Sequence, residues 1–290
     1  MKIDIPIINA FVDEHKGGNP AGVVLDAQQY SQDQKQRIAA SIGLSETAFV
    51  SPSSVADFKL EFFTPTRQIA HCGHATIATF CYLRQIGLLP NDQTSKETID
   101  GRREILMQGD MAYMEQSAPR YIELDQAHRD RALGSLGLEP SDLLEGAEPC
   151  VVNTGNSFLI IGLKDSARTK SIRPIMTDIS AISDEYDLIG YYVFCPEAVK
   201  AGRDAGARMF APRYGIDEEA ATGMAAGPLA CYLRDKLKIQ KHQFLIEQGY
   251  FMSPASPSVI DVKLQAEQGS IISLMAGGKA AVSETRQLEI

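Results

Sequence analysis

Short apolar runs, bounded by Gly, Pro, Asn or Asp, recur along most of the chain. They are rich in Val, Ile and Phe, a composition typical of buried β-strands. We therefore predict strands over residues 3–12, 21–25, 47–50, 58–63, 158–161 and 244–247. Because a few helical patterns lie between these runs, the chain is predicted to be a mixed α/β (α+β) protein.

One predicted helix, over residues 31–42, has signals at both ends. Ser31 is placed to accept a backbone N–H at the start of the helix, and Gln34 is placed to bond back to Ser31, as in a capping box. Gly43 supplies the stop. The apolar positions fall on one face, which predicts an amphipathic helix lying on a surface; they are Ile38, Ala39 and Ile42.

Two further helices, predicted over residues 74–86 and 223–237, are apolar almost all round in their first turns. A helix without a polar face must be buried on every side. The tetrapeptide CYLR lies in both helices, at 81–84 and at 231–234. Upstream, Phe-Thr-Pro at 63–65 matches Phe-Ala-Pro at 210–212. Two matches in the same order, on the same type of helix, indicate a duplication.

The duplication predicts two pseudo-symmetric lobes. Each is expected to be a sheet or barrel wrapped around its buried central helix. We place the boundary near residue 120, with residues 1–120 as the N-terminal lobe and 121–290 as the C-terminal lobe. The C-terminal strand is expected to join the N-terminal lobe. The acidic segment 139–148 is predicted to be a surface loop or helix of the second lobe.

Composition and charge argue against several classes of protein, including nucleic-acid-binding and membrane-spanning ones. The 290 residues are 44% hydrophobic, and 28 Lys and Arg against 37 Asp and Glu give a net charge of −9. Such a charge repels phosphate backbones and anionic membranes, so we expect no nucleic-acid partner. The longest nearly apolar stretch, 224–233, is shorter than the roughly 20 residues of a membrane span. Five widely spaced cysteines and an acidic start predict a cytoplasmic protein without disulfides.

The loops before the two central helices are candidate sites, because a helix N-terminus presents free N–H groups and partial positive charge. Gly73 and Gly223 would let a ligand approach these loops closely. If the lobes face each other, both helix ends point into one cleft, where a carboxylate could bind. Glu46, an acid leading into an apolar strand, is a candidate general acid or base. Taken singly, each feature also fits an ordinary capped helix or an exposed loop glutamate.

Metal and nucleotide sites are not favoured. His71, Cys72 and His74 are crowded into four residues, and three such ligands rarely face one ion. Gly-Gly-Lys at 277–279 is followed by Ala280 rather than Ser or Thr, so no phosphate loop is predicted. No GxGxxG follows a strand either. We therefore predict neither a metal nor a cofactor.

Five short motifs occur in the order found in one known family. They are Gly18-Asn19-Pro20-Ala21, Leu44-Ser45-Glu46-Thr47-Ala48-Phe49, Phe63-Thr64-Pro65, Gly73-His74-Ala75-Thr76 and the segment from Ala220 to Ala230. Together they resemble the PhzF family of phenazine-biosynthesis proteins, which has the diaminopimelate epimerase-like fold. The resemblance extends from Ile8 to at least Ser258. It implies two α/β lobes with the site between them, and isomerase chemistry without metal or organic cofactor, usually in a homodimer.

The resemblance also implies roles for individual residues. Glu46 resembles the family's catalytic acid/base, which moves a proton and shifts a double bond in trans-2,3-dihydro-3-hydroxyanthranilate. His74 resembles the residue that orients and hydrogen-bonds the substrate, and Glu219 is a predicted further catalytic group. The predicted substrate-binding residues are Asn19, Gly73, Thr222, Gly223 and Met224.

Two positions depart from the family pattern. Glu219 stands where the family usually has Asp, and Met224 stands where the phenazine enzyme has Ser. Loss of a side-chain hydrogen bond to a small polar substrate costs roughly 1–3 kcal/mol of discrimination. We therefore predict a PhzF-like isomerase acting on a small carboxylate-bearing substrate other than dihydro-hydroxyanthranilate.

Two alternative functions stay open from the sequence. Cys72-Gly73-His74 resembles the motif of proline racemases, which use two thiols on opposite faces of the substrate, and a helix N-terminus would favour the Cys72 thiolate. The second thiol should fall near Ala220, where no cysteine lies. A Cys72/Glu219 pair would have to replace the two thiols. The other alternative is a small-molecule-binding protein that retains the fold without catalysis.

Overall fold

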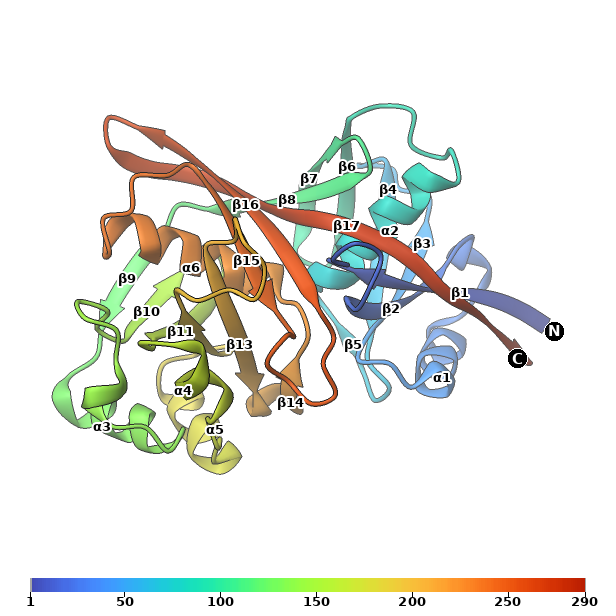
Figure 1. Ribbon diagram of the computed structural model, residues 1–290. Coiled ribbons are helices and arrows are strands. Elements are labelled where there is room, and N and C mark those ends of the chain that lie inside the picture. The colour runs from blue at the N-terminus through green and yellow to red at the C-terminus, as the bar shows by residue number, and fades with distance from the viewer. Residues whose placement is uncertain (1, 290) are drawn as a thin grey trace. The chain divides into compact units, whose positions relative to one another are not determined.

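The computed structural model describes residues 2–289. Strands dominate it, with a few helices among them, which confirms the mixed α/β class (Figure 1). The chain divides into two compact units. The first holds the residues up to Glu115 and those from Gly277 onwards, and the second holds Gln116–Ala276.

The strands of the first unit close into a barrel. They are β1 (Lys2–Ala10), β2 (Asn19–Val24), β3 (Thr47–Ser51), β4 (Phe58–Phe63), β6 (Gln93–Thr98), β7 (Gly101–Gln108), β8 (Met111–Ser117) and β17 (Ser270–Glu289), with the short β5 (Gln68–Ile69) beside β4. Each of these eight strands pairs with the next, and β17 also pairs with β1. Closure covers the sheet edges that an open sheet would expose.

The central helix of the first unit is α2 (Gly73–Gln85), which packs against β1, β2 and β3. Residues 73–81 are all buried, as the apolar sequence predicted. Thr76 and Thr79 are accommodated because their hydroxyls donate to backbone carbonyls four residues earlier, at 2.6 and 2.7 Å. The first turn of α2 is therefore fixed inside the barrel.

The amphipathic helix α1 (Gln32–Ile42) covers part of the same unit. The predicted capping box is present: Ser31 Oγ accepts from the Gln34 backbone N–H at 3.3 Å, and Gln34 Oε1 accepts from the Ser31 N–H at 2.9 Å. Gly43 ends the helix with a φ of 67°. The apolar face packs in one cluster with strand residues Ile5, Ile7, Val24, Phe49 and Phe63.

The second unit repeats the strand pairing of the first. Its strands are β9 (Arg120–Glu123), β10 (Cys150–Asn153), β11 (Ser157–Gly162), β12 (Gly190–Cys195), β13 (Ala205–Ala211), β14 (Ile216–Glu219), β15 (Gln243–Gln248) and β16 (Ser258–Glu267). Antiparallel and parallel pairs alternate from β10 to β16 as they do from β1 to β7. β14 lies beside β13 as β5 lies beside β4. The predicted duplication is confirmed.

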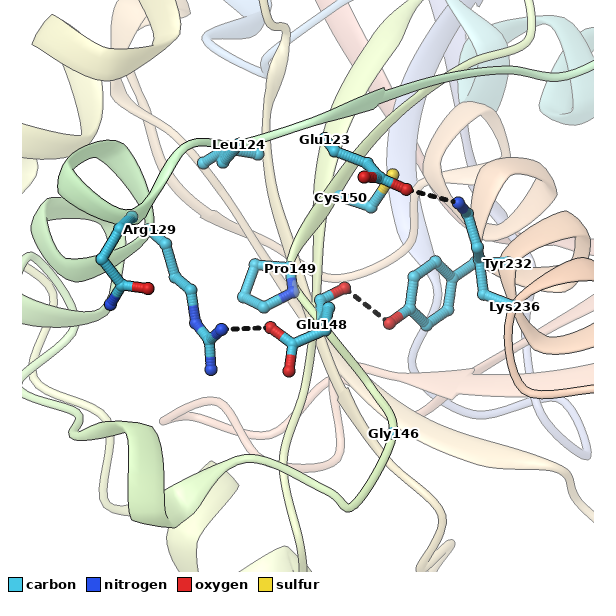
Figure 2. Close-up of a pocket in the computed structure, with 10 residues that line it drawn as sticks. Glu123, Leu124, Arg129, Gly146, Glu148, Pro149, Cys150, Tyr232 and Lys236 are labelled. Atoms are coloured by element: carbon cyan, nitrogen blue, oxygen red, sulfur yellow. Dashed lines mark hydrogen bonds and ion pairs between the residues drawn. The ribbon is translucent and has the colours of Figure 1, made fainter.

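The central helix of the second unit is α6 (Gly223–Asp235), which packs against β10, β11, β15 and β16. Residues 225–233 are all buried. Pro228 lies inside this helix and has no N–H, so the carbonyl of Met224 lacks the donor that a regular helix would supply. A cavity of about 300 Å³ lies at the C-terminal end of α6 (Figure 2).

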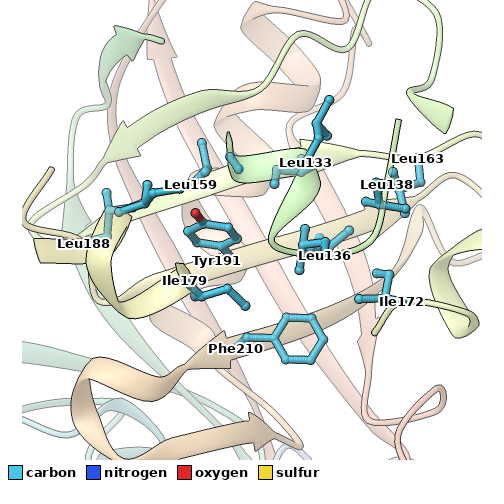
Figure 3. Packing of buried hydrophobic residues seen from close by; sticks show 14 of the residues in the cluster. Leu133, Leu136, Leu138, Leu159, Leu163, Ile172, Ile179, Leu188, Tyr191 and Phe210 are labelled. Carbon is cyan, nitrogen blue, oxygen red and sulfur yellow. The ribbon is translucent and has the colours of Figure 1, made fainter. Parts of the chain in front are cut away.

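Three outer helices complete the second unit, namely α3 (Gln126–Gly134), α4 (Ser166–Lys170) and α5 (Met176–Glu185). A hydrophobic cluster joins α3 and α5 to strands β11, β12 and β13 (Figure 3). Leu133, Ile179, Leu159, Tyr191 and Phe210 are fully or almost fully buried in it. The two units are alike in this respect, because in the first unit the outer helix α1 also packs an apolar face against strands.

The short 3₁₀ helices, the cysteines and the lengths of the helices bear on the remaining expectations. Single-turn 3₁₀ helices lie at Ala27–Gln29, Pro140–Asp142 and Pro212–Tyr214, the second of them in the acidic segment 139–148. All five cysteines are free and buried. Among the helices of residues 2–289, none has the length and apolar character needed to cross a bilayer.

Candidate active site

Glu46 lies directly before β3, in the first unit. Its backbone carbonyl accepts from the Gly22 N–H at 3.3 Å, which ties the residue to β2. Only 7% of Glu46 is exposed. A carboxyl group that is shielded from bulk water is a candidate general acid or base.

His74 is the second residue of α2 and is buried like Glu46. Its Nε2 lies 3.3 Å from Glu46 Oε2. The predicted catalytic residues of the first unit are therefore neighbours, although 28 positions separate them in the sequence. Because β3 and the first turn of α2 are both fixed in the barrel, this contact is preorganised.

Cys72 is the N-cap of α2 and is buried. Its Sγ lies 3.6 Å from His74 Nδ1. Burial raises the pKa of the Cys72 thiol, and the neighbouring Glu46 adds to this, although the nearby His74 opposes it. The expectation that the helix N-terminus favours a Cys72 thiolate is therefore wrong, because burial outweighs the helix dipole.

The same three residues offer atoms that lie within 4.8 Å of one another, a spacing that a metal ion could bridge. Glu46 Oε2 lies near Nε2 and Cys72 Sγ lies near Nδ1 of the same imidazole. Because an ion takes only one of the two ring nitrogens, these residues supply at most three protein ligands, one fewer than a closed structural zinc site. That no metal binds here stays a prediction of the sequence.

In the second unit, Glu219 is the last residue of β14 and is partly exposed. Thr222, the N-cap of α6, donates its hydroxyl to Glu219 Oε2 in a short hydrogen bond. The loop between them thus fixes the direction of the carboxylate.

Gln248, at the end of β15, organises this loop and was not predicted from the sequence. Its Nε2 donates to the Glu219 carbonyl (2.7 Å) and to Thr222 Oγ1 (3.1 Å). Its Oε1 accepts from the Thr222 N–H (3.0 Å) and from the Tyr192 hydroxyl (2.9 Å). The side chain is fully buried with all four bonds made. A buried amide at the end of an apolar strand was the available signal.

The predicted binding residues lie near these groups within each unit. Gly73 is the first residue of α2, and the buried Asn19 begins β2. Gly223 begins α6, and its carbonyl accepts from Gln116 Nε2 at 2.9 Å. Met224 is partly exposed, and its Sδ lies 3.4 Å from Asn156 Nδ2.

The cavity at the C-terminal end of α6 is not a candidate active site. Figure 2 shows its charged groups facing one another: Lys236 contacts Glu123 at 3.2 Å, and Arg129 contacts Glu148. The Tyr232 hydroxyl donates to the Glu148 carbonyl at 2.7 Å. Since these groups satisfy one another, they present little unpaired charge to a ligand.

Comparison with known proteins agrees with this architecture. The family model of the phenazine biosynthesis-like proteins (PhzC-PhzF) matches residues 8–286. An uncharacterised isomerase of Clostridium acetobutylicum is 31% identical over 97% of this chain and 96% of its own. The trans-2,3-dihydro-3-hydroxyanthranilate isomerase of Pseudomonas chlororaphis is also 31% identical, over 94% of this chain and 95% of its own.

A solved structure extends the likeness to three dimensions. The PhzF-family phenazine biosynthesis protein of Bacillus anthracis superposes with a TM-score of 0.91, at 26% identity, over 100% of both chains. Fold and relatives together define an isomerase. The chain belongs to the phenazine biosynthesis-like, or PhzF, family.

Proposed function

We propose that the chain catalyses a proton shift within a small carboxylate-bearing substrate, with Glu46 as the proton carrier. The observation that carries the proposal is the 3.3 Å contact between the buried Glu46 Oε2 and His74 Nε2. The imidazole, which lies beside the carboxyl group, is proposed to bind a polar group of the substrate. Positioning and general acid/base catalysis supply the rate enhancement.

The proposed step conserves atoms and electrons. The Glu46 carboxylate removes a proton from a carbon beside a double bond, and the electrons of that C–H bond form a new double bond. The electrons of the old double bond move to the far carbon, where Glu46 returns the proton. Substrate and product are isomers, and neither an oxidant nor a second substrate enters. One carboxyl group within reach of both carbons is enough.

Glu219 is proposed as a further polar group for the same substrate, held by Thr222. The free N–H groups at the starts of α2 and α6, near Gly73 and Gly223, are proposed to bind the substrate carboxylate, as helix N-termini bind anions. Asn19 and Met224 are proposed to contact the substrate as well. Homodimer formation stays a prediction of the family resemblance, and a cytoplasmic location stays a prediction of the cysteines and the acidic start; sedimentation would test the first.

The substrate is proposed to differ from the one named for the Pseudomonas relative. In this chain Met224 follows Gly223, and its thioether carries no hydroxyl to donate. Methionine favours apolar contact instead. We therefore expect a substrate with an apolar group where dihydro-hydroxyanthranilate has a polar one.

The test is proton NMR in deuterated water with dihydro-hydroxyanthranilate and a panel of small unsaturated, amino and hydroxy acids. Glu46→Gln is compared with Glu61→Gln, which alters a buried glutamate of the same unit that pairs with Lys35. We expect isomerisation or deuterium uptake that Glu46→Gln abolishes and Glu61→Gln retains. Exchange that survives in Glu46→Gln but stops in Cys72→Ala would favour the racemase alternative. Binding without exchange would favour the non-catalytic alternative.

A further inference from the structure

Lys96 is a buried lysine that the proposed mechanism does not use. It lies on β6 in the first unit, and its side chain is fully buried. Its Nζ donates to Thr76 Oγ1 at 2.6 Å and lies 3.4 Å from His71 Nδ1. The third side of the ammonium faces the Phe62 ring, 5.3 Å from its centroid. Among the described residues, no carboxylate forms an ion pair with it.

Such a group is costly to bury. A charged amine loses its hydration, and only an opposite charge with good hydrogen bonds restores that loss. Burial accordingly lowers the pKa of Lys96 to about 7. The titratable groups around it act in both directions, because Cys72 and Asp100 raise this pKa while Arg103 lowers it. A methionine would fill the same space without the cost, so the amine is expected to have a role beyond packing.

The contacts of Lys96 link it to the chain segment immediately before α2. Thr76, which accepts from Lys96, donates its own hydroxyl to the Cys72 carbonyl at 2.6 Å. His71, the other polar neighbour, immediately precedes Cys72. The two residues before Gly73 are thus linked to the Lys96 ammonium group, His71 directly and Cys72 through Thr76. His74 directly follows Gly73, so the direction of its ring depends on how this turn is held.

His71 is suited to accept the second contact. Burial, and then the charges of Lys96 and Arg103, hold the pKa of His71 well below its usual range. The ring is therefore neutral near pH 7, and its Nδ1 lone pair is available to the ammonium. The hydroxyl of Thr76 is oriented in the same way, because it accepts from Lys96 and must send its own proton to Cys72.

We propose that Lys96 is a positioning residue for the Glu46–His74 pair, holding the turn before α2 through Thr76 and His71. This inference rests on the proposed function of Glu46 and His74. Lys96 acts through other residues and does not contact the substrate. Its expected effect is to keep His74 Nε2 beside Glu46 Oε2, 3.3 Å away.

The chain supplies a matched control on the same helix. Thr76 and Thr79 are both fully buried, and both donate to the carbonyl four residues earlier. Only Thr76 also accepts from Lys96. Replacing either by valine removes one buried hydroxyl from α2 and preserves its shape. A difference between the two variants therefore reports on the link to Lys96 and not on helix stability.

The experiment uses the full chain with ¹⁵N-labelled histidine, whose five residues give few imidazole signals. His74→Gln identifies the His74 ring. We expect Lys96→Met and Thr76→Val to shift the two His74 nitrogen signals, while Thr79→Val leaves them in place. Folded Lys96→Met and Thr76→Val proteins with unchanged His74 signals would overturn the proposal.

Lys96→Gln is the second variant, to be used if Lys96→Met does not fold. An amide still donates to Thr76 without a charge, so the His74 signals are expected to stay near those of the wild type. If Lys96→Gln shifts them as strongly as Thr76→Val does, the hydrogen-bond route through Thr76 is wrong.

Turnover gives a second readout once a substrate is found. Lys96→Met is expected to lower kcat by about tenfold or more with KM changed by less than about threefold, because a misdirected base slows chemistry more than binding. An equal rise in KM with kcat unchanged would contradict a positioning role. Absence of turnover in the wild type would count against the proposed function alone, since the imidazole signals report on Lys96 without any substrate.

Discussion

At the scale of single residues, buried polar side chains decide the local geometry of both candidate groups. Gln248 illustrates this, because its hydrogen bonds allow only one orientation of its amide. The Thr222 N–H can only donate and the Glu219 carbonyl can only accept, so Oε1 must face the first and Nε2 the second. The direction of the Glu219 carboxylate therefore depends on a residue that a substrate need not touch.

Gln248→Leu is expected to destabilise the protein by about 2–4 kcal/mol, because it leaves the buried Thr222 N–H and the Tyr192 hydroxyl without their acceptor. Chemical denaturation followed by circular dichroism measures this. Tyr192→Phe is the matched control, since it removes one bond to the same amide and leaves the loop bonds intact. It should cost only about 1 kcal/mol. Equal losses in the two variants would contradict the role given to the loop bonds.

Lys96 gives a pH dependence whose sign follows from its pKa. That pKa is about 7 in the folded chain, against 10.5 for an ordinary lysine. Between these values the unfolded chain holds the proton and the folded chain does not, so unfolding takes up a proton and stability rises with pH. We expect the Tm of the wild type to rise relative to that of Lys96→Met between about pH 7 and about pH 9.5. A constant Tm difference across this range would contradict the lowered pKa.

At the scale of elements, the helix signals were the most informative part of the sequence. Ser31, Gln34 and Gly43 lie at the ends of α1 as predicted, because capping is a local interaction that neighbours in sequence determine. The apolar all-round pattern likewise identified α2 and α6. Strand β6 shows the opposite case. Its sequence, Gln93–Thr98, is polar throughout, yet four of its six residues are buried in the barrel.

The polar strand explains why part of the site could not be predicted. Lys96 is buried because Thr76, His71 and Phe62 surround it, and these come from other elements. Hydrophobic periodicity registers burial only where buried residues are apolar. The Glu46–His74 pair came from a family resemblance, since spacing alone does not show that a strand end and a helix start adjoin.

Ser31→Ala is expected to lower stability by about 1 kcal/mol, because the Gln34 N–H loses its acceptor at the start of α1. Ser41→Ala serves as the control on the same helix. Its exposed hydroxyl only donates to the Arg37 carbonyl, which the helix already occupies, so the change should be within about 0.5 kcal/mol of neutral. Urea denaturation compares them. A cost for Ser41→Ala as large as that for Ser31→Ala would count against the capping box.

At the scale of the whole molecule, the two repeats share their topology but not their chemistry. His74 and Met224 are both the second residue of a central helix. Glu46 precedes β3, while Ile189 precedes the corresponding strand β12. The proposed acid/base pair therefore belongs to the first unit alone. This asymmetry supports proton transfer by a single carboxyl group over a mechanism with matched thiols in both repeats.

Removal of the residues after Ala276 is expected to unfold the first unit, because it deletes the strand that pairs with both β1 and β8. Limited proteolysis with peptide identification measures this, and cleavage is expected throughout residues 2–115. A chain shortened only after Arg286 is the control, since it loses just the pairs of residues 2–4. Protection of the first unit in the longer deletion would show that β17 is dispensable.

The position of β17 also has a consequence for synthesis. A ribosome releases the chain from its N-terminus, so the residues up to Glu115 emerge long before the strand that closes their barrel. The second unit is complete once Ala276 has emerged. We therefore expect the first unit to stay open, with the edges of β1 and β8 uncovered, until the second unit has been made. In the cell, this interval is when the nascent chain most needs protection from aggregation.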